Sequence, residues 1–258
     1  MTVLRPILRY SDGAFSRLED EVIEEVPLTL VVNGRELLTL MTLGGNGDEL
    51  AVGFLRSEGF LGRKEQLKSV SLGDGRVLVE IDADVELIVK LSVKRTVTTG
   101  CGKGTVFTSP VEGLKLRPVA EGIHFSPEDI LGRMRELEGR SELFRRTGGV
   151  HNAALMAPGK IIHMRSDIGR HNAVDMLGGR LLLDSSPGEG NALLVTGRVS
   201  SEILRKTAAM GVPVLVSRSA PTTLALDMAA ELGVTVVGYA RAGRFNVYTH
   251  SQRITSEV

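Results

Sequence analysis

The second half of the chain alternates short apolar runs with amphipathic segments, and this pattern most constrains the fold. Residues 192–196, 213–217 and 234–238 are apolar and β-branched, which predicts three buried strands. Residues 200–210 and 222–232 lie between them and have helical spacing of their apolar side chains. Because strands joined through helices run parallel, the pattern predicts a parallel sheet covered by helices, in an α/β fold.

Further elements are predicted upstream of this region. Residues 153–156 and 161–164 are apolar runs around a Pro158-Gly159 turn. The run from Asp167 to Leu177 is helical towards its end. Ser126, followed by a proline and two acidic residues, predicts a helix that extends to about residue 142.

The first third of the chain is typical of β structure. Residues 25–32 and 35–43 flank Asn33-Gly34 and predict a hairpin, and residues 69–72 and 77–81 predict a second one. Residues 85–93 predict a further strand. Asp48 is the expected N-cap of an intervening helix. We therefore expect a β-rich part over residues 1–115 and an α/β part over residues 116–258.

Composition narrows the classes of function. The 258 residues carry 31 basic and 31 acidic side chains, so net charge gives no case for a nucleic-acid binder. No apolar run approaches the ~20 residues that a membrane span needs. A single cysteine excludes an internal disulfide, an all-cysteine zinc site and a Cys-x-x-Cys pair within one chain. We expect a cytoplasmic protein that binds neither nucleic acid nor membrane.

Cys101 is the first candidate for chemistry. It lies between Gly100 and Gly102, with Lys94, Arg95 and Lys103 nearby in sequence. Glycine neighbours leave a sulfur open to close approach, and cations stabilise the reactive thiolate. A lone cysteine can also be a small buried apolar residue.

Two His-Asn pairs form a second candidate group. His151-Asn152 follows Gly148-Gly149-Val150, and His171-Asn172 belongs to the run Asp167 to Asn172. Such pairs either bind a ligand or fix loops to one another, and loop fixing is favoured without further information. No spacing typical of a metal site is present.

Two strand-to-helix loops each carry an arginine among hydroxyl side chains. Arg198 follows the strand at residues 192–196, and Arg218 follows the next strand. Parallel sheets bind ligands at the ends where such loops meet, and helix N-termini favour anions. Ordinary helix capping with solvated arginines is the alternative.

The segment after the last strand contains two more arginines. Arg241 and Arg244 flank Gly243, and guanidinium groups bind phosphate through paired hydrogen bonds. Plain surface arginines would give the same pattern.

Six motifs together resemble the FdhD/NarQ family, the formate dehydrogenase accessory sulfurtransferases. They cover nearly the whole chain in order: residues 48–59 (DELAVGFLRSEG), 148–151 (GGVH), 167–175 (DIGRHNAVD), 196–202 (TGRVSSE), 217–222 (SRSAPT) and 247–250 (VYTH).

The resemblance implies a function and a set of partners. Family members take sulfur from a cysteine desulfurase and pass it to the bis(molybdopterin guanine dinucleotide) cofactor, which is bound as substrate before insertion into formate dehydrogenase. GDP is the expected mimic of that substrate. The resemblance also implies a homodimer, a cytidine-deaminase-like α/β sandwich after a smaller β-rich part, and Cys101 as persulfide carrier. The expected cofactor-binding segment is Tyr239, Ala240, Arg241, Ala242, Gly243 and Arg244; Arg198 and Arg218 are added from their loop positions.

The chain departs from the family pattern in its cysteine motif. Family members carry Cys-Gly-x-Cys-Gly, whereas this chain has Gly104 where the second cysteine would stand. A chaperone that binds the cofactor without carrying sulfur is therefore the alternative function. The zinc signature of deaminases is absent, so we expect neither zinc nor deamination. The identity of the metal, molybdenum or tungsten, and of the desulfurase stays open.

Overall fold

The computed structural model describes residues 1–83, 116 and 118–255. The strand predicted at residues 85–93 and the candidate Cys101 lie outside these residues.

The first part of the chain forms β1 (Thr2–Ser11), β2 (Ala14–Ile23), β3 (Val26–Val32), β4 (Arg35–Thr42), α1 (Gly47–Ser57), η1 (Lys64–Gln66), β5 (Leu67–Gly73) and β6 (Arg76–Ile81). The second part forms α3 (Pro127–Arg140), α4 (Glu142–Thr147), β7 (His151–Ala157), β8 (Lys160–Asp167), α5 (Arg170–Leu183), β9 (Ala192–Val195), α6 (Ser201–Ala209), β10 (Val214–Ser217), α7 (Thr223–Leu232), β11 (Thr235–Arg241), β12 (Arg244–Val247) and η3 (Ser251–Arg253).

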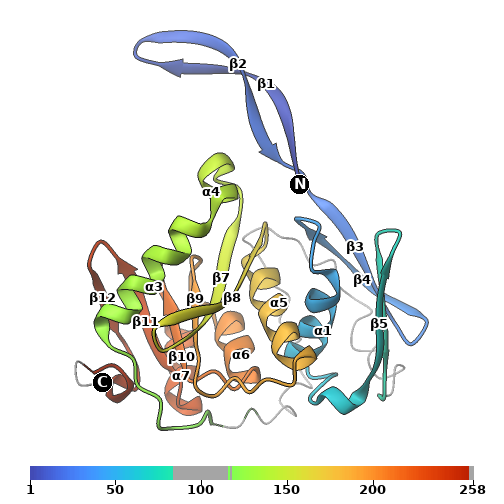
Figure 1. Ribbon diagram of the computed structural model, residues 1–258, viewed down its shortest axis with the longest axis vertical. Coiled ribbons are helices and arrows are strands. Elements are labelled where there is room, and N and C mark those ends of the chain that lie inside the picture. Colours follow the sequence, from blue (N-terminus) through green and yellow to red (C-terminus); the bar gives the residue numbers. More distant parts are fainter. Residues whose placement is uncertain (84–115, 117, 256–258) are drawn as a thin grey trace.

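The second part is a six-stranded mixed sheet in the order β12-β11-β10-β9-β7-β8. Strands β9, β10 and β11 are parallel, while β7, β8 and β12 are joined antiparallel. Helices α5, α6 and α7 cover one face and α3 covers the other (Figure 1). The predicted α/β sandwich with parallel central strands is therefore confirmed.

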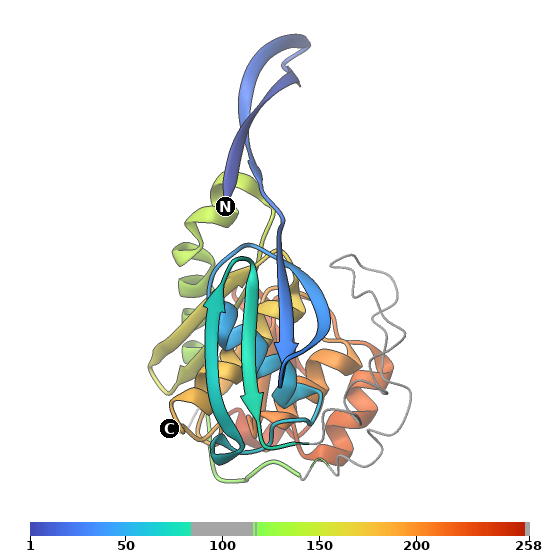
Figure 2. The ribbon, with the colours of Figure 1, turned by 90° about the vertical axis from the view of Figure 1, so that its right-hand side faces the viewer.

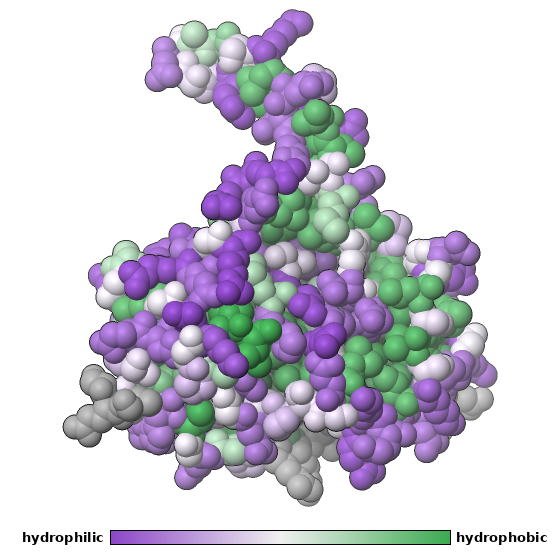
Figure 3. Space-filling model, in the orientation of Figure 1, coloured by the Kyte–Doolittle hydropathy of each residue, from purple (hydrophilic) through white to green (hydrophobic). Residues whose placement is uncertain are grey.

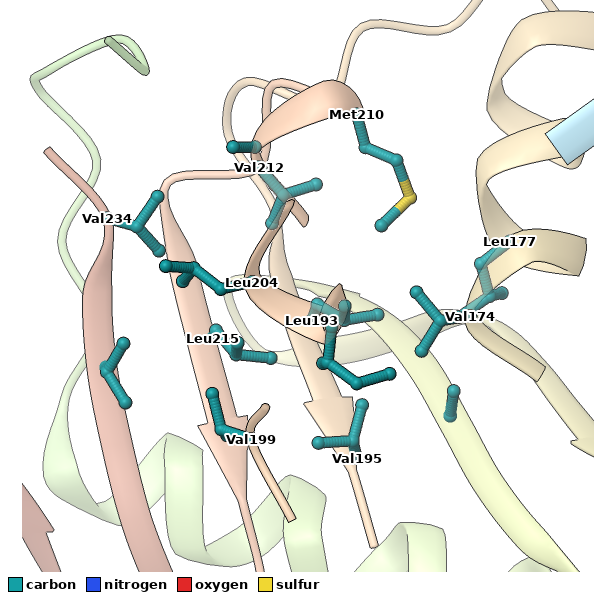
Figure 4. Close-up of a cluster of buried hydrophobic side chains, with 14 of the residues drawn as sticks. Val174, Leu177, Leu193, Val195, Val199, Leu204, Met210, Val212, Leu215 and Val234 are labelled. Atoms are coloured by element: carbon teal, nitrogen blue, oxygen red, sulfur yellow. The ribbon is translucent and has the colours of Figure 1, made fainter. Parts of the chain in front are cut away.

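Side-chain alternation along the central strands builds two apolar layers on this sheet. On β9, Leu193 and Val195 join the layer under α5, α6 and α7, and Leu194 joins the layer under α3. Figure 4 shows the first layer, where Val174 and Leu177 of α5 face the strands. Because both faces are covered, the strands are apolar throughout, as parallel buried strands must be.

The first part is a four-stranded sheet in the order β4-β3-β6-β5, and α1 packs on it. The two predicted hairpins are present, and β3 and β6 pair in parallel at its centre. Helix α1 also packs against α5 of the second part. At their crossing, a Cβ atom on Gly53 would lie 1.7 Å from the Asp175 carbonyl oxygen, and one on Gly179 would lie 1.9 Å from the Glu49 carbonyl oxygen. The two backbones are in direct contact, which only glycine permits.

One predicted helix start is wrong, and one predicted helix end lies two residues beyond the observed end. Helix α1 is preceded by Asn46 in the left-handed conformation, with φ of 49°, and Asp48 lies in the first turn instead of capping it. Asparagine tolerates positive φ, and a first-turn carboxylate still stabilises the helix dipole. Helix α3 ends at Arg140 because Ser141 leaves the helical region and its hydroxyl donates to Asn152 Oδ1 at 2.9 Å.

Strands β1 and β2 form a separate two-stranded hairpin that no motif predicted. It projects from the body in both ribbon views (Figures 1 and 2). Across the described part of the chain, no helix has the length and apolar character needed to cross a membrane.

Candidate functional site

Two strand-to-helix loops meet at the carboxyl end of β9 and β10, as the sequence predicts. The Ser217 hydroxyl donates to the Gly197 carbonyl at 2.7 Å, and the Val199 amide donates to the Ala220 carbonyl at 3.1 Å. Ser200 and Thr222 cap the two following helices through their hydroxyl oxygens. The two loops are therefore hydrogen-bonded to each other at this edge of the sheet.

Strand β7 runs antiparallel to β9 and so begins at this same edge. Its first residue, His151, lies beside Gly197, where an added Cβ atom would be 3.4 Å from the ring Nδ1. The Asn152 amide donates to the Thr196 hydroxyl at 3.0 Å, which closes the gap between the two strands. The first His-Asn pair thus lies next to the loop that carries Arg198.

A cavity of about 450 Å³ opens at this edge. This volume is within the range of sites for small organic ligands. Its lining combines cationic, hydroxyl and backbone groups: Glu138, Phe144, Arg145, Gly148, Gly149, Val150, His151, Asn152, Ile168, Thr196 and Arg218.

Glu138 of α3 joins this cavity to a second, smaller one. Its Oε1 lies 2.6 Å from Arg218 Nε, so the predicted Arg218 is held by a carboxylate. Glu138 also lines a hollow of about 80 Å³ together with residues 240–243 of the β11–β12 hairpin. The predicted Arg218 and the predicted hairpin segment therefore lie on either side of one side chain.

The hairpin segment has an unusual backbone. Tyr239 and Ala242 have φ of 55° and 51°, and Gly243 has φ of 76°. The Arg241 guanidinium lies 5.7 Å from the centre of the Tyr239 ring, which is cation–π geometry. Arg244 and Arg198 are both exposed, and neither of them lines either cavity. The structure thus places residues 240–243 beside Glu138, which holds Arg218, while Arg198 lines neither cavity.

The two histidines have different surroundings but the same charge state. Burial, and then the charge of Arg170, lowers the pKa of His151. Burial, with Lys206, Arg170 and His151 nearby, lowers the pKa of His171 to about 3. Both rings are therefore neutral near pH 7, and His151 presents a neutral imidazole to the larger cavity.

The two asparagines fix loops. Asn152 Oδ1 accepts from Ser141 and Ser166 at 2.9 and 2.6 Å, and Asn172 Nδ2 donates to the Met41 carbonyl at 3.0 Å. Asp167 is fully buried and accepts from the Leu43 amide at 2.9 Å. Burial raises the pKa of Asp167, while its hydrogen bonds act in the opposite direction. This cluster ties the end of β4 to the start of α5, and so holds the two parts of the chain together beside the cavity.

Among the described residues, no three His, Cys, Asp or Glu side chains are grouped as a metal site requires.

A comparison with protein-family models gives a match over residues 23–255 to the model described as the FdhD/NarQ family. The chain belongs to the FdhD/NarQ family.

Curated relatives agree with this assignment over almost the whole chain. A protein of Geobacillus kaustophilus named sulfur carrier protein FdhD is 43% identical over 252 residues, covering 97% of this chain and 96% of that one. A protein of Bacillus licheniformis with the same name is 41% identical over 256 residues, covering 98% and 97%.

A solved structure extends the FdhD/NarQ likeness to three dimensions. A crystal structure from Desulfotalea psychrophila, described as that of a formate dehydrogenase accessory protein, matches with a TM-score of 0.83. The two chains are 27% identical, and the match covers 98% of this chain and 99% of the other.

Several cavity residues of this FdhD/NarQ chain were missed by sequence reasoning. Glu138, Phe144 and Arg145 belong to α3 and α4, which carry no family motif. Their only signal is position, since α4 ends just before the Gly148-Gly149 pair. His151 was assigned to loop fixing, yet it lines the cavity.

Proposed function

We propose that this chain is a sulfur carrier for the molybdenum cofactor of formate dehydrogenase. It accepts sulfane sulfur from a cysteine desulfurase and delivers it to the bis(molybdopterin guanine dinucleotide) cofactor, its bound substrate. Membership of the FdhD/NarQ family over residues 23–255, together with Cys101 as the chain's only thiol, carries this proposal.

The first step is a thiol exchange without net oxidation. The Cys101 thiolate attacks the outer sulfur of the desulfurase persulfide, a new S–S bond forms, and the desulfurase cysteine leaves as its thiolate. Cys101 then carries the persulfide. Transfer of its outer sulfur to the cofactor as sulfide would break the S–S bond, return Cys101 to its thiolate and consume two electrons from a thiol reductant. Lys94, Arg95 and Lys103 are close to Cys101 in sequence and favour the thiolate form.

The carboxyl edge of the sheet supports the second half of the proposal. A molybdopterin guanine dinucleotide carries phosphates and a purine, and it needs cations beside an open site. Arg241 and Arg244 supply exposed guanidinium groups at the hairpin, and the larger cavity adds the side chains of Arg145 and His151. The neutral ring of His151 contacts the ligand without adding charge.

Intact mass spectrometry tests the sulfur-carrier step directly. After incubation with a cysteine desulfurase and cysteine, the chain should gain the mass of one sulfur atom, which a reductant removes. The Cys101→Ser variant, which differs by one atom, should gain none. An unchanged mass of the wild-type chain, or a gain that survives in Cys101→Ser, would contradict the proposal.

A chaperone that binds the cofactor without carrying sulfur is the second candidate. It is favoured by Gly104, which stands where family members have a second cysteine. Under this alternative, Cys101→Ser would restore formate dehydrogenase activity in a reconstitution assay as well as the wild-type chain does.

A further inference from the structure

Glu138 is a carboxylate at a position where the pattern of α3 predicts an apolar side chain. Ile130 and Met134 precede it at intervals of four residues, and both are buried against the six-stranded sheet. The outward side of α3 and α4 is hydrophilic instead, as the mostly purple surface over these helices in Figure 3 shows. Glu138 also lies in the last turn of α3, where the partial negative charge of the helix end disfavours an acid. Neither the packing nor the dipole of α3 therefore accounts for this residue.

Arg218 accounts for only part of the Glu138 carboxylate. The Nε atom of Arg218 lies 2.6 Å from Glu138 Oε1, and this ion pair fixes the direction of the carboxylate. The Glu138 side chain is still 41% exposed, and it lines both the larger cavity and the small hollow at the hairpin. An ionised carboxylate has about four acceptor positions on its two oxygens, so a single guanidinium leaves acceptor positions for a ligand.

The larger cavity places an aromatic ring in the same site as this carboxylate. Phe144 of α4 lines the cavity and is 41% exposed. Exposed aromatic rings stack on nucleobases, and such stacking tolerates any base because every base has a π face. A cavity of about 450 Å³ has room for a purine.

The chemistry of the carboxylate then distinguishes between the purines. A carboxylate only accepts hydrogen bonds, so it pairs with a ligand edge that presents two adjacent N–H donors. Guanine has such an edge in its ring N1–H and its exocyclic amino group, whereas adenine has an acceptor at ring N1. Cations for phosphates lie on both sides of Glu138, because Arg145 lines the larger cavity and Arg241 lines the small hollow. The combination is that of a guanine nucleotide site.

We propose that Glu138 and Phe144 select the guanine base of the ligand. Phe144 stacks on the base, and Glu138 accepts hydrogen bonds from its N1–H and its amino group, while Arg218 holds the carboxylate in place. These residues of α3 and α4 add a base-selecting site to the arginine segment at residues 239–244. The inference rests on the proposed function, since it identifies the residues that read the guanine of the dinucleotide.

Calorimetry with GDP, IDP and ADP tests the role of Glu138 on the full chain. IDP lacks the exocyclic amino group of GDP, and ADP has an acceptor at ring N1. Wild type should therefore bind GDP about 10-fold or more tighter than either.

Glu138→Gln replaces one acceptor oxygen by a donor and keeps an acceptor for Arg218, so the variant should fold as wild type does. Its preference for GDP over ADP should fall about 10-fold or more. Glu142→Gln is the matched control, because Glu142 is 73% exposed and lines neither cavity. This control should keep the wild-type preference.

Phe144→Leu tests the stacking contact in the same titrations. Since stacking does not distinguish the bases, affinity for all three nucleotides should fall about 10-fold and their order should stay the same. Unchanged affinities in this variant would overturn the role of Phe144.

The outcomes separate this inference from the proposed function. A wild-type preference for GDP in Glu138→Gln would overturn the inference alone. An equal loss of affinity for all three nucleotides in that variant would do the same, because Glu138 would then act only through Arg218. A wild-type chain that binds GDP and ADP equally also overturns only the inference. A wild-type chain that binds no GDP would overturn both the inference and the cofactor half of the proposed function.

Discussion

Charged side chains gather in two regions of this protein, and the two regions use them differently. Where α1 meets α5 and α6, Lys206 is only 3% exposed and donates to both oxygens of Asp175 at 2.7 and 2.9 Å and to Ser57 at 3.0 Å. At the carboxyl edge of the six-stranded sheet, Arg241 and Arg244 are exposed to solvent.

The difference separates charges that hold the fold from charges that are available to a ligand. A buried cation without its partner would be strongly destabilising, so Lys206 and Asp175 are bound to each other. An exposed guanidinium stays solvated until an anion replaces water, so the edge can bind and release. Substitutions in the first region should therefore act on stability, and those in the second on ligand affinity.

Of the substitutions considered, Gly53→Ala should have the largest effect on the stability of the first region. Its methyl group would lie 1.7 Å from the Asp175 carbonyl oxygen, so α1 and α5 must separate. We expect a loss of about 3 kcal/mol or more in the free energy of unfolding, measured by urea denaturation. Gly132→Ala is the matched control, since nothing lies within 4 Å of the added atom, and it should be neutral or slightly stabilising. Equal stability of the two variants would show that the helices are not in backbone contact.

Lys206→Met should destabilise the same junction. The change leaves the Asp175 carboxylate buried without its cation, and we expect a loss of about 3–5 kcal/mol. Arg76→Met breaks an exposed pair with Glu36 and should change stability by less than about 1 kcal/mol. A loss below about 1 kcal/mol for Lys206→Met would remove the distinction between the two kinds of charge.

Arg241→Ala/Arg244→Ala should act on binding and leave stability nearly unchanged. Each guanidinium can form charge-assisted hydrogen bonds with a phosphate, so GDP affinity should fall about 10-fold or more in calorimetry. Lys68→Ala/Arg76→Ala removes the same charge from the four-stranded sheet and should bind GDP as wild type does. Equal affinity of all three chains would place the nucleotide elsewhere.

His171→Gln should change the pH dependence of stability by the smallest amount. Unfolded histidine has a pKa near 6.5, and burial lowers that of His171 to about 3, so the unfolded chain binds more protons between these values. Stability therefore falls as the pH drops below about 6.5. Replacing His171 should remove about 1 kcal/mol of the decrease between pH 7.5 and 5.5. Parallel stability curves for wild type and variant over this range would contradict the burial of a neutral ring.

Much of the fold was predictable because hydrophobic periodicity reflects local geometry. The strands around residues 193, 215 and 236 and the helices between them were located from pattern alone, and Asn33-Gly34 marked its hairpin. The end of α3 was not predictable, because Ser141 leaves the helix to bond Asn152, eleven residues away. The β1–β2 hairpin was missed because its strands mix apolar and charged residues without a clean alternation.

The part of the candidate site that lies at a strand end was predictable, because strand ends are visible in the local sequence pattern. Arg218 follows the end of β10, a position that the sequence reveals. Residues 239–244, predicted to follow the last strand, instead span the end of β11, a turn and the start of β12. Glu138, Phe144 and Arg145 come from helices that the sequence does not direct towards any ligand, and only packing of α3 on the sheet brings Glu138 to Arg218.

The sequence by itself determined the alternation of strands and helices, the family motifs and the presence of one thiol, because each depends on residue type and local spacing. Only the tertiary structure decided which charges are buried with a partner and which are free to bind. It also decided that α1 and α5 touch through Gly53 and Gly179, and that the β1–β2 hairpin projects from the body. These features depend on contacts between residues far apart in the chain, and the energy of such contacts is defined only once the chain has folded.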